Sequence, residues 1–294
     1  MTYSIKEINI ADDNIELEIR ELIKSAFKDD QLLPHKYILN NVKSNASKPS
    51  FFLAAKENDR FIGCLGFLAN DFVLNAKSYV GYQLCWAAVH PLHQGKKVFV
   101  NIVNEAKKIL KEEGAGFLYA GPANKNSYPI LIHKLNFKEL FPIRKRIINS
   151  VFAPLLKFRS VKEKIFLDVC AINEEQVKNY KFLQFPDDIK VIFFKESWLW
   201  GKIIRKQIIG IKISIFYVGG IYLKDQNDLK QLIQIIFKSY KILFVELFCT
   251  ISHTLYHLIR NWQKPKGSPG FVFFNLNLPK FNHLNLMIGA IDVF

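Results

Sequence analysis

Residues 88–101, AVHPLHQGKKVFVN, decide the fold of this chain. An apolar run ends at Val89, a proline turn and a Gln-Gly-Lys-Lys cluster follow, and an apolar helical pattern then resumes. A strand that leads through such a loop into a helix presents free N–H groups and the positive end of the helix dipole. Gly95 lets the backbone approach a ligand, and Lys96 and Lys97 add positive charge. This strand–loop–helix segment, residues 88–101, which we call the seam, therefore predicts a phosphate-binding site. A solvated pair of lysines on a turn is the alternative.

Upstream of the seam, the pattern predicts a strand, a helix and three antiparallel strands. The helix follows a capping Asp12 or Asp13 and has an apolar face that ends at Phe27. The Asn-Asp pair within Glu57 to Arg60 is a turn signal between two strands. The predicted strands are 4–10, two within 51–71, and 79–89.

Downstream of the seam, strands and helices alternate. A helix over 97–114 ends at Gly114, and a strand at 116–123, a helix at 126–135 and two strands within 137–158 follow. After about residue 160 the order partly repeats, with strands at 212–223, 241–250 and 270–278 and helices at 225–240 and 252–262, the first capped by Asp225 or Asn227 and the second by Ser252. The order predicts an α/β fold in which the second half is a structural duplication of part of the first.

The composition indicates a folded protein with a basic balance. Half of the 294 residues are hydrophobic, including 26 Phe, which excludes a disordered chain. The 41 Lys and Arg exceed the 26 Asp and Glu, and the net charge of +15 favours an anionic partner such as nucleic acid, an anionic membrane or a phosphorylated small molecule. A diffuse compositional bias is the alternative, since no Arg-rich patch or basic amphipathic helix is present.

The sequence predicts neither a metal site nor a membrane span. The four cysteines are far apart in apolar runs, which is typical of buried free thiols, and His253 and His257 are expected to pack rather than to bind metal. The most lipophilic region, 207–223, is interrupted by Lys212 and is shorter than the roughly 20 residues that a spanning helix needs. The acidic N-terminal region is unlike a signal peptide, so we expect a cytoplasmic protein.

Two segments together resemble a known family. VHPLHQGKKVF, residues 89–99, is similar to the acyl-CoA pyrophosphate loop of GNAT acyltransferases, with Gln94 at its first position, Lys97 in place of its first glycine and Phe99 in place of a small residue. GPANKNSYPILIHKLNF, residues 121–137, resembles the family's Asn-x-Asn-Ser-Tyr-Pro helix, with Asn136 in place of a glycine. The resemblance covers about residues 1–150.

The resemblance implies acyl-CoA as cosubstrate and no metal. In the family, pantetheine pairs with the strand before the loop, and the N–H groups of the loop hold the pyrophosphate. The residues expected to bind CoA are Trp86, Ala87, Val89, Gln94, Gly95, Lys96, Lys97, Val98, Phe99 and Asn124.

The resemblance also implies direct attack of an amine on the thioester. His90 is the predicted base, with His93 or water as alternatives, although a histidine before proline is often part of the turn. The family's tyrosine acid falls near Leu131 and Ile132, which leaves Tyr128 as the nearest candidate, with Asn126 beside it. The motif can equally be a helix cap with proline in the first turn.

The length and the ending LMIGAIDVF, residues 286–294, resemble a tandem-GNAT branch linked to bacterial surface-polysaccharide synthesis, in lipopolysaccharide or capsule. That branch implies transfer of an acetyl or larger group, such as hydroxybutyryl, to the amine of a nucleotide-linked amino sugar. It also implies two tandem GNAT-like domains, each a mixed, largely antiparallel sheet flanked by helices. Residues 1–150 would be the acyl-CoA-binding domain, and residues 151–294 a degenerate GNAT-like domain that braces the fold and walls the acceptor pocket. Basic residues that could meet a diphosphate are Lys36, Lys43, Arg144, Lys145 and Arg146. The alternatives are an N-acetyltransferase for a protein lysine or small amine, and a non-catalytic GNAT module that binds a ligand or nucleic acid.

Overall fold

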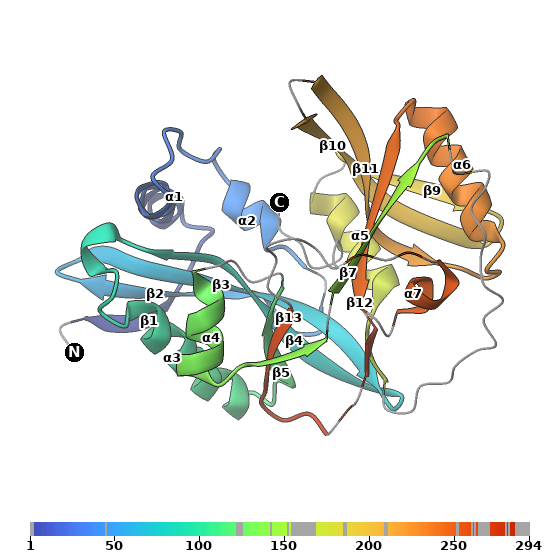
Figure 1. The fold of residues 1–294 in the computed structure, drawn as a ribbon. Coiled ribbons are helices and arrows are strands. Elements are labelled where there is room, and N and C mark those ends of the chain that lie inside the picture. The colour runs from blue at the N-terminus through green and yellow to red at the C-terminus, as the bar shows by residue number, and fades with distance from the viewer. Residues whose placement is uncertain are drawn as a thin grey trace.

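The computed structural model describes residues 3–44, 46–121, 126–141, 143–151, 153, 169–184, 187–208, 211–250, 253–259, 261, 263, 271–279, 281 and 283–285. Its elements in chain order are β1 Ser4–Ile8, α1 Asp13–Phe27, α2 Tyr37–Asn41, β2 Phe51–Glu57, β3 Arg60–Leu74, β4 Lys77–Val89, η1 Pro91–His93, α3 Val98–Glu112, β5 Phe117–Ala120, α4 Ser127–Leu135, β6 Lys138–Phe141, β7 Ile143–Asn149, β8 Val169–Ile172, α5 Glu174–Gln184, β9 Ile189–Phe194, β10 Ser197–Ile208, β11 Ile211–Tyr222, α6 Asp228–Tyr240, β12 Phe244–Thr250, α7 Thr254–Leu258, β13 Phe271–Asn275 and β14 His283–Asn285 (Figure 1).

The strands form two sheets. The first runs in the order β1-β2-β3-β4-β5-β13-β6, with β8 paired to β3 and to β14; the second runs β7-β12-β11-β10-β9. Most neighbours are antiparallel, and the parallel pairs are β4 with β5, β11 with β12 and β8 with β14. The predicted fold class, mixed α/β with largely antiparallel sheets flanked by helices, is confirmed.

Local signals place the elements of the first sheet where the sequence predicts them. Asp12 caps α1, because its Oδ1 accepts hydrogen bonds from the N–H groups of Asn14 and Ile15 at 2.9 and 3.2 Å. The turn between β2 and β3 is Asn58 and Asp59, both with positive φ.

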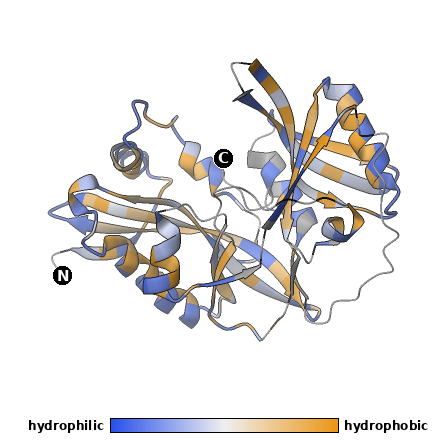
Figure 2. Ribbon diagram, in the orientation of Figure 1, coloured by the Kyte–Doolittle hydropathy of each residue, from blue (hydrophilic) through white to orange (hydrophobic). Residues whose placement is uncertain are grey.

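Helices cover both faces of the first sheet (Figure 1). On one face, an apolar stripe of α3 packs on β2 to β5 and on α4; we call this the α3 cluster, and it includes Val98, Ile102, Ala106, Leu110, Tyr82, Leu118 and Leu131. On the other face, Ile19 and Ile23 of α1 pack with Phe52 and Leu68. Figure 2 shows hydrophobic residues along the strands and both hydrophobic and hydrophilic stretches on the helices.

Two strands pair with strands from the other half of the sequence. β7 pairs with β12 in the second sheet, with Ile148 opposite Val245, and β13 lies between β5 and β6 in the first sheet, with Phe273 opposite Tyr119. The two strands predicted within 137–158 are therefore present but lie in different sheets. The division of the chain into domains at residue 150 stays a prediction, because each sheet contains residues from both halves.

The second half also covers the first sheet with a helix. β8 pairs with the far end of β3, and Gln176 of α5 donates from Nε2 to Asp71 Oδ2 at 2.8 Å. Val177 of α5 packs in one cluster with Phe72 of β3 and Trp198 of β10. The face of the first sheet opposite α3 is thus covered by α1, α2, α5 and β10.

The cap of α6 is one of the two predicted residues, whereas the cap of α7 differs from the prediction. At α6, Asn227 is the cap residue without a side-chain hydrogen bond, and Asp225 Oδ1 accepts from Asn227 N–H at 2.8 Å. At α7, His253 is the cap, with Nδ1 accepting from Leu255 N–H at 3.1 Å; the predicted cap Ser252 lies outside the described residues. His253 therefore has a structural role.

The four cysteines are buried free thiols, as predicted. Burial raises the pKa of the Cys64, Cys85 and Cys170 thiols to about 12. None of the helices that the structure describes combines the length and the apolar composition needed to cross a bilayer.

Candidate active site

β4 carries a bulge where it approaches the seam. Cys64 pairs with Ala88 and Gly66 with Cys85, so β4 has one residue more than β3 between these two pairs. The extra residue is accommodated at Trp86, whose φ of 51° lies in the left-handed region. The bulge therefore lies at the first of the predicted CoA-binding residues.

β4 and β5 part at the same level. Their parallel pairing consists of Gly81 with Phe117, Tyr82 with Leu118 and Gln83 with Tyr119. Beyond Gln83, no strand in the described part of the chain pairs with the β5 side of β4. Residues 84–89 therefore present one strand edge, which we call the β4 edge, to a possible extended partner.

The β4 edge leads directly to the start of α3. Lys97 is the cap residue, its carbonyl oxygen accepts from Asn101 N–H at 2.9 Å, and no side chain caps the helix. The first turn contains no acidic residue. The first N–H groups of an α-helix have no intrahelical acceptor, so this uncapped end can bind an anion.

Lys97 has a φ of 64°, which is the left-handed conformation that glycine adopts most easily. This explains why the family pattern has glycine at this position. The backbone keeps the glycine-like geometry although the side chain is a lysine, at a cost of roughly 1–2 kcal/mol. Gly95 also has a positive φ, 79°, and a side chain built there would meet no atom within 4 Å. The loop is therefore open around Gly95.

Two side chains of the loop bind its own backbone. Gln94 donates from Nε2 to the Val89 carbonyl oxygen at 3.2 Å, and His90 Nδ1 accepts from Leu92 N–H at 3.3 Å. Because Nδ1 of His90 is a hydrogen-bond acceptor, the proton of the neutral ring lies on Nε2. Nδ1 of His90 thus serves as the cap acceptor of the turn, and the role of His90 as base stays a prediction.

The second histidine lies close to the first. The ring centroids of His90 and His93 are 5.9 Å apart, and His93 Nε2 lies 3.9 Å from Glu57 Oε2 at the end of β2. His93 therefore has a carboxylate neighbour on β2, whereas the described contact of His90 Nδ1 is with its own loop backbone.

α4 holds the candidate acid. The helix packs on the α3 cluster through Leu131 and Leu135, and the hydroxyl of Tyr128 donates a short hydrogen bond to Glu139 Oε2 on β6. That hydrogen bond, with smaller effects of burial and of the carboxylate charge, raises the pKa of Tyr128, so the hydroxyl stays protonated. Asn126 precedes the helix and makes no side-chain cap bond, and Asn124 lies outside the described residues.

Sequence reasoning missed two of the described residues on the face opposite α3, Gln83 and Lys181, and the indole nitrogen of Trp86 beside them. Gln83 is 5% exposed, and its Oε1 has no hydrogen-bond partner among the described residues; the same holds for Nε1 of Trp86. Lys181 of α5 is buried, and its charge lowers the pKa of Cys85, although the larger effect of burial raises it. The available signal was a lone glutamine within the apolar run 79–89.

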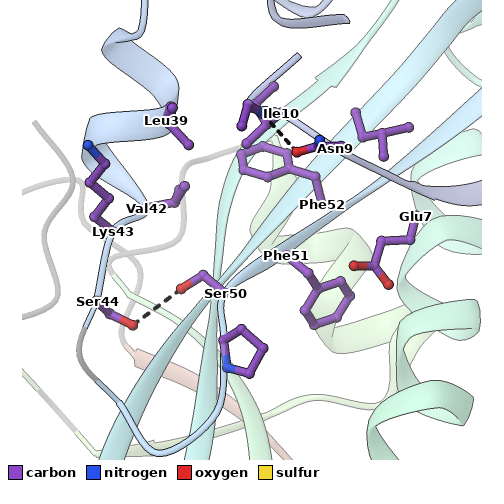
Figure 3. Close-up of a pocket in the computed structure, with 13 residues that line it drawn as sticks. Glu7, Asn9, Ile10, Leu39, Val42, Lys43, Ser44, Ser50, Phe51 and Phe52 are labelled. Atoms are coloured by element: carbon purple, nitrogen blue, oxygen red, sulfur yellow. Dashed lines mark hydrogen bonds between the residues drawn. The ribbon is translucent and has the colours of Figure 1, made fainter.

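The cavity in Figure 3 is separate from the seam. It has a volume of about 630 Å³ and lies between α2 and the chain around β1 and β2, with Leu39, Val42 and Phe52 among its lining residues. None of residues 84–99 lines it. α2 nevertheless borders both this cavity and the β4 edge, because the ring centroid of Tyr37 in α2 lies 5.8 Å from that of Trp86.

Two of the basic residues considered for an acceptor diphosphate have partners inside the fold. Lys145 pairs with the buried Glu246, and Arg146 donates to the carbonyl oxygen of Asn261 at 3.1 Å. Over the residues that the structure describes, no group of three or more His, Cys, Asp or Glu side chains could hold a metal ion.

The seam lies within a stretch that matches a known family. Residues 16–137 match the model of the acetyltransferase (GNAT) family. A search of curated proteins finds no match to the sequence.

Several solved structures share the fold over nearly the whole chain. A conserved protein of unknown function from Enterococcus faecalis V583, described as a probable N-acyltransferase, has a TM-score of 0.65 at 11% identity, over 94% of this chain and 73% of that chain. A GCN5-related N-acetyltransferase from Anabaena variabilis ATCC 29413 has a TM-score of 0.63 at 9% identity, over the same shares. Eis1 from Mycobacterium abscessus has a TM-score of 0.54 at 8% identity, over 93% of this chain and 73% of that chain. Residues 16–137, which contain the seam, match the GNAT acetyltransferase family model, and the chain shares its overall fold with these solved structures.

Proposed function

We propose that the chain transfers an acyl group from acyl-CoA to the amine of a nucleotide-linked amino sugar. The observation that carries the CoA part is the continuity of the β4 edge with the uncapped start of α3. The first offers main-chain groups to an extended ligand, and the second offers N–H donors to phosphate, with Lys96 and Lys97 beside it.

The proposed CoA site uses mainly backbone groups. Trp86, Ala87 and Val89 would pair with pantetheine, and Asn124 would add a side-chain hydrogen bond. In the loop, the N–H groups of Gln94 and Lys96 already donate to carbonyl oxygens at 3.3 Å. The pyrophosphate would therefore be held by the N–H groups of Gly95, Lys97, Val98 and Phe99, with Lys96 and Lys97 adding charge.

The reaction is direct attack of a neutral amine on the thioester carbon. A C–N bond forms, the C–S bond breaks, the nitrogen loses one proton and the CoA sulfur gains one. Tyr128, with Asn126 beside it, is the proposed donor of the proton to sulfur. His90 is the sequence-based proposal for the acceptor of the amine proton, with His93 or water as the alternative.

The net charge of the chain and the position of its second half support the proposed class of acceptor. A diphosphate fits a chain of net charge +15, and α5 and β10 cover the face of the first sheet from which an acceptor would enter. A larger acyl group such as hydroxybutyryl, a cytoplasmic location and a role in lipopolysaccharide or capsule synthesis belong to the same proposal.

Calorimetric titration with CoA at moderate salt tests the site, and the glycines offer a matched pair of variants. Gly95 and Gly114 have φ values of 79° and 76°, both have open space, and they lie at opposite ends of α3. We expect Gly95→Trp to abolish CoA binding and Gly114→Trp to leave it intact. Equal CoA affinity in both variants would show that the loop is misassigned.

Acceptor identity is then tested with acetyl-CoA and a panel of nucleotide-linked amino sugars, lysine peptides and small amines. CoA release above the hydrolysis rate with the amino sugars alone supports the proposal. Turnover of peptides or small amines alone would replace the acceptor class. Salt-sensitive nucleic-acid binding without CoA binding would favour a non-catalytic module.

A further inference from the structure

A buried oxygen lies without a partner at the point where β4 and β5 part. Gln83 is the last β4 residue to pair with β5, its side chain is 5% exposed, and its Oε1 has no hydrogen-bond partner in the described part of the chain. A buried polar atom without a partner destabilises a protein, so such an atom in a folded chain needs an explanation.

The fold satisfies other polar groups beside Gln83. Asn70 of β3 is 1% exposed, and its Nδ2 donates to the hydroxyl of Tyr119 at 2.7 Å. Tyr119 is the residue opposite Gln83 in the ladder. A buried amide and a buried phenol next to Gln83 are thus paired with each other, whereas Gln83 Oε1 is left open.

Gln83 points to the face of the sheet opposite α3. Its neighbours Tyr82 and Leu84 belong to the α3 cluster, and successive side chains of a strand point to opposite faces. Cys85 and Trp86 pack on that other face with α1 and α2. Nε1 of Trp86 is likewise buried without a partner among the described residues, so an open donor lies on the same face as the open acceptor of Gln83.

The proposed function places the thioester near this pair of groups, and the inference rests on it. With the pyrophosphate at residues 95–99, pantetheine runs along the β4 edge from Val89 toward Cys85, so the acyl group ends near Gln83. The reacting end of acetyl-CoA has a carbonyl oxygen and a sulfur but no N–H or O–H group. It cannot satisfy Gln83 Oε1, whereas an amine can.

We propose that Gln83 Oε1 accepts a hydrogen bond from the acceptor amine and aims its lone pair at the thioester carbon. Trp86 Nε1 donates to an oxygen substituent close to that amine, such as a hydroxyl group. The amine keeps the N–H bond held by Gln83, loses its other proton, and forms the C–N bond as the C–S bond breaks and the sulfur takes up a proton. Gln83 takes part in no proton transfer.

The charge of Lys181 supports an uncharged amine at this place. Lys181 is 2% exposed and acts electrostatically on Cys85, two residues from Gln83. A nearby positive charge and a buried setting both favour the neutral form of an amine, which is the nucleophilic form. The acceptor is therefore a primary amine with a neighbouring oxygen, bound in its neutral form.

The melting temperature of a Gln83 variant distinguishes a role in binding the amine from a role in stabilising the fold. Gln83→Met has nearly the same length without the oxygen, and we expect the ligand-free variant to melt at the same temperature as the wild type or above it. Tyr82→Phe, next to it but facing α3, is the control for aromatic packing. A melting temperature lowered by several degrees in Gln83→Met would mean that Gln83 holds the fold together, and would overturn the proposal.

Activity provides the second test, with acetyl-CoA and hydroxylamine as a small neutral amine, corrected for the protein-free rate. We expect Gln83→Met to lose about tenfold or more in kcat/KM for hydroxylamine, with CoA affinity and acetyl-CoA hydrolysis unchanged. Gln83→Glu keeps an oxygen at the position and should retain more aminolysis than Gln83→Met.

The outcomes distinguish a failure of the role of Gln83 from a failure of the proposed function. CoA binding by the wild type together with full aminolysis in Gln83→Met would overturn the role of Gln83 alone. CoA binding without any aminolysis by the wild type would also overturn it. If the wild-type protein does not bind CoA, the proposed function fails and this inference fails with it.

Discussion

The side chain of Gln94 donates a hydrogen bond to the carbonyl oxygen of Val89, over 3.2 Å between Nε2 and O. The residue that begins the loop motif thus ties the loop to the end of β4. It shapes the loop, and the proposed function assigns ligand binding to the loop backbone.

Gln94→Ala should therefore weaken CoA binding through loop geometry. Loss of one hydrogen bond of about 0.5–1.5 kcal/mol predicts a roughly two- to tenfold rise in the Kd for CoA, measured by calorimetry. Gln31→Ala, an exposed glutamine elsewhere, is the control. An unchanged Kd in Gln94→Ala would show that the loop keeps its shape without this bond.

Lys97→Gly should make the protein more stable and CoA binding weaker. Removing the left-handed lysine relieves about 1 kcal/mol, which is a rise in Tm of about 2–4 °C, while the lost charge reduces affinity at low salt. Lys36 also has a positive φ, 58°, and caps α2. We expect Lys36→Gly to raise Tm by a similar amount without changing CoA affinity. If Lys36→Gly also weakened CoA binding, the effect of Lys97→Gly on affinity would not be local to the loop.

His90→Asn separates capping from catalysis. Asparagine keeps a side-chain acceptor for Leu92 N–H, and we expect this variant to keep most of the turnover, whereas His90→Ala loses the cap and some stability. Steady-state rates with acetyl-CoA and an accepted amine decide this. A loss of about 100-fold or more in both variants, with CoA binding intact, would instead identify His90 as the base.

Tyr128→Phe should lower kcat by about 100-fold and leave the Kd for CoA unchanged, if the phenol protonates the leaving sulfur. Its partner gives the matched variant. Glu139→Gln removes the charge that helps to raise the pKa of Tyr128, so the phenol becomes a stronger acid and kcat should hold or rise. Wild-type rates in Tyr128→Phe would remove Tyr128 from the mechanism.

Glu246 makes stability depend on pH. Its side chain is 1% exposed and lies between Lys145 and Lys206, the latter at 2.9 Å. Burial alone would raise the pKa of Glu246, but the hydrogen bonds and charges of the two lysines outweigh it, and the pKa is lowered below its usual 4.5. The stabilisation is therefore fully present above about pH 4.5 and is lost as the pH falls through the lower, folded-state pKa.

Glu246→Gln should accordingly cost about 1–3 kcal/mol at pH 7 and progressively less as the pH falls below about 4.5. Denaturant unfolding at several pH values measures this difference. Glu105→Gln, which removes an exposed pair with Lys108, should cost less than about 0.5 kcal/mol at every pH. A penalty for Glu246→Gln that stays constant down to pH 3 would contradict the lowered pKa.

The sequence predicts most elements of the first sheet because their signals are local. Asp12 caps a helix, Asn58 and Asp59 form a turn, and Gly114 ends α3 with a positive φ of 76°. The place of β13 has no local signal. Phe271 and Val272 read as a strand in either sheet, and their pairing with β5 joins residues far apart in the chain.

The site is predicted less completely, for two physical reasons. The bulge at Trp86 needs a left-handed residue, and a tryptophan gives no sign of one. Gln83 stands out as polar within an apolar strand, but its open oxygen depends on what neighbouring strands and helices leave unpaired. The loop stands out in the sequence because a glutamine, a glycine and two lysines follow each other directly.

β7 and β13 each pair with strands from the other half of the sequence, so the sheets are completed late during synthesis. The edge of β5 is complete only when β13 emerges, about 150 residues later, and at ribosomal rates this is a delay of roughly 8–30 s. During that interval the nascent chain exposes Leu118 and Tyr119 beside an open strand edge, which can pair with other chains. Chaperone dependence and low-temperature expression should therefore affect the yield of this protein more than its final stability.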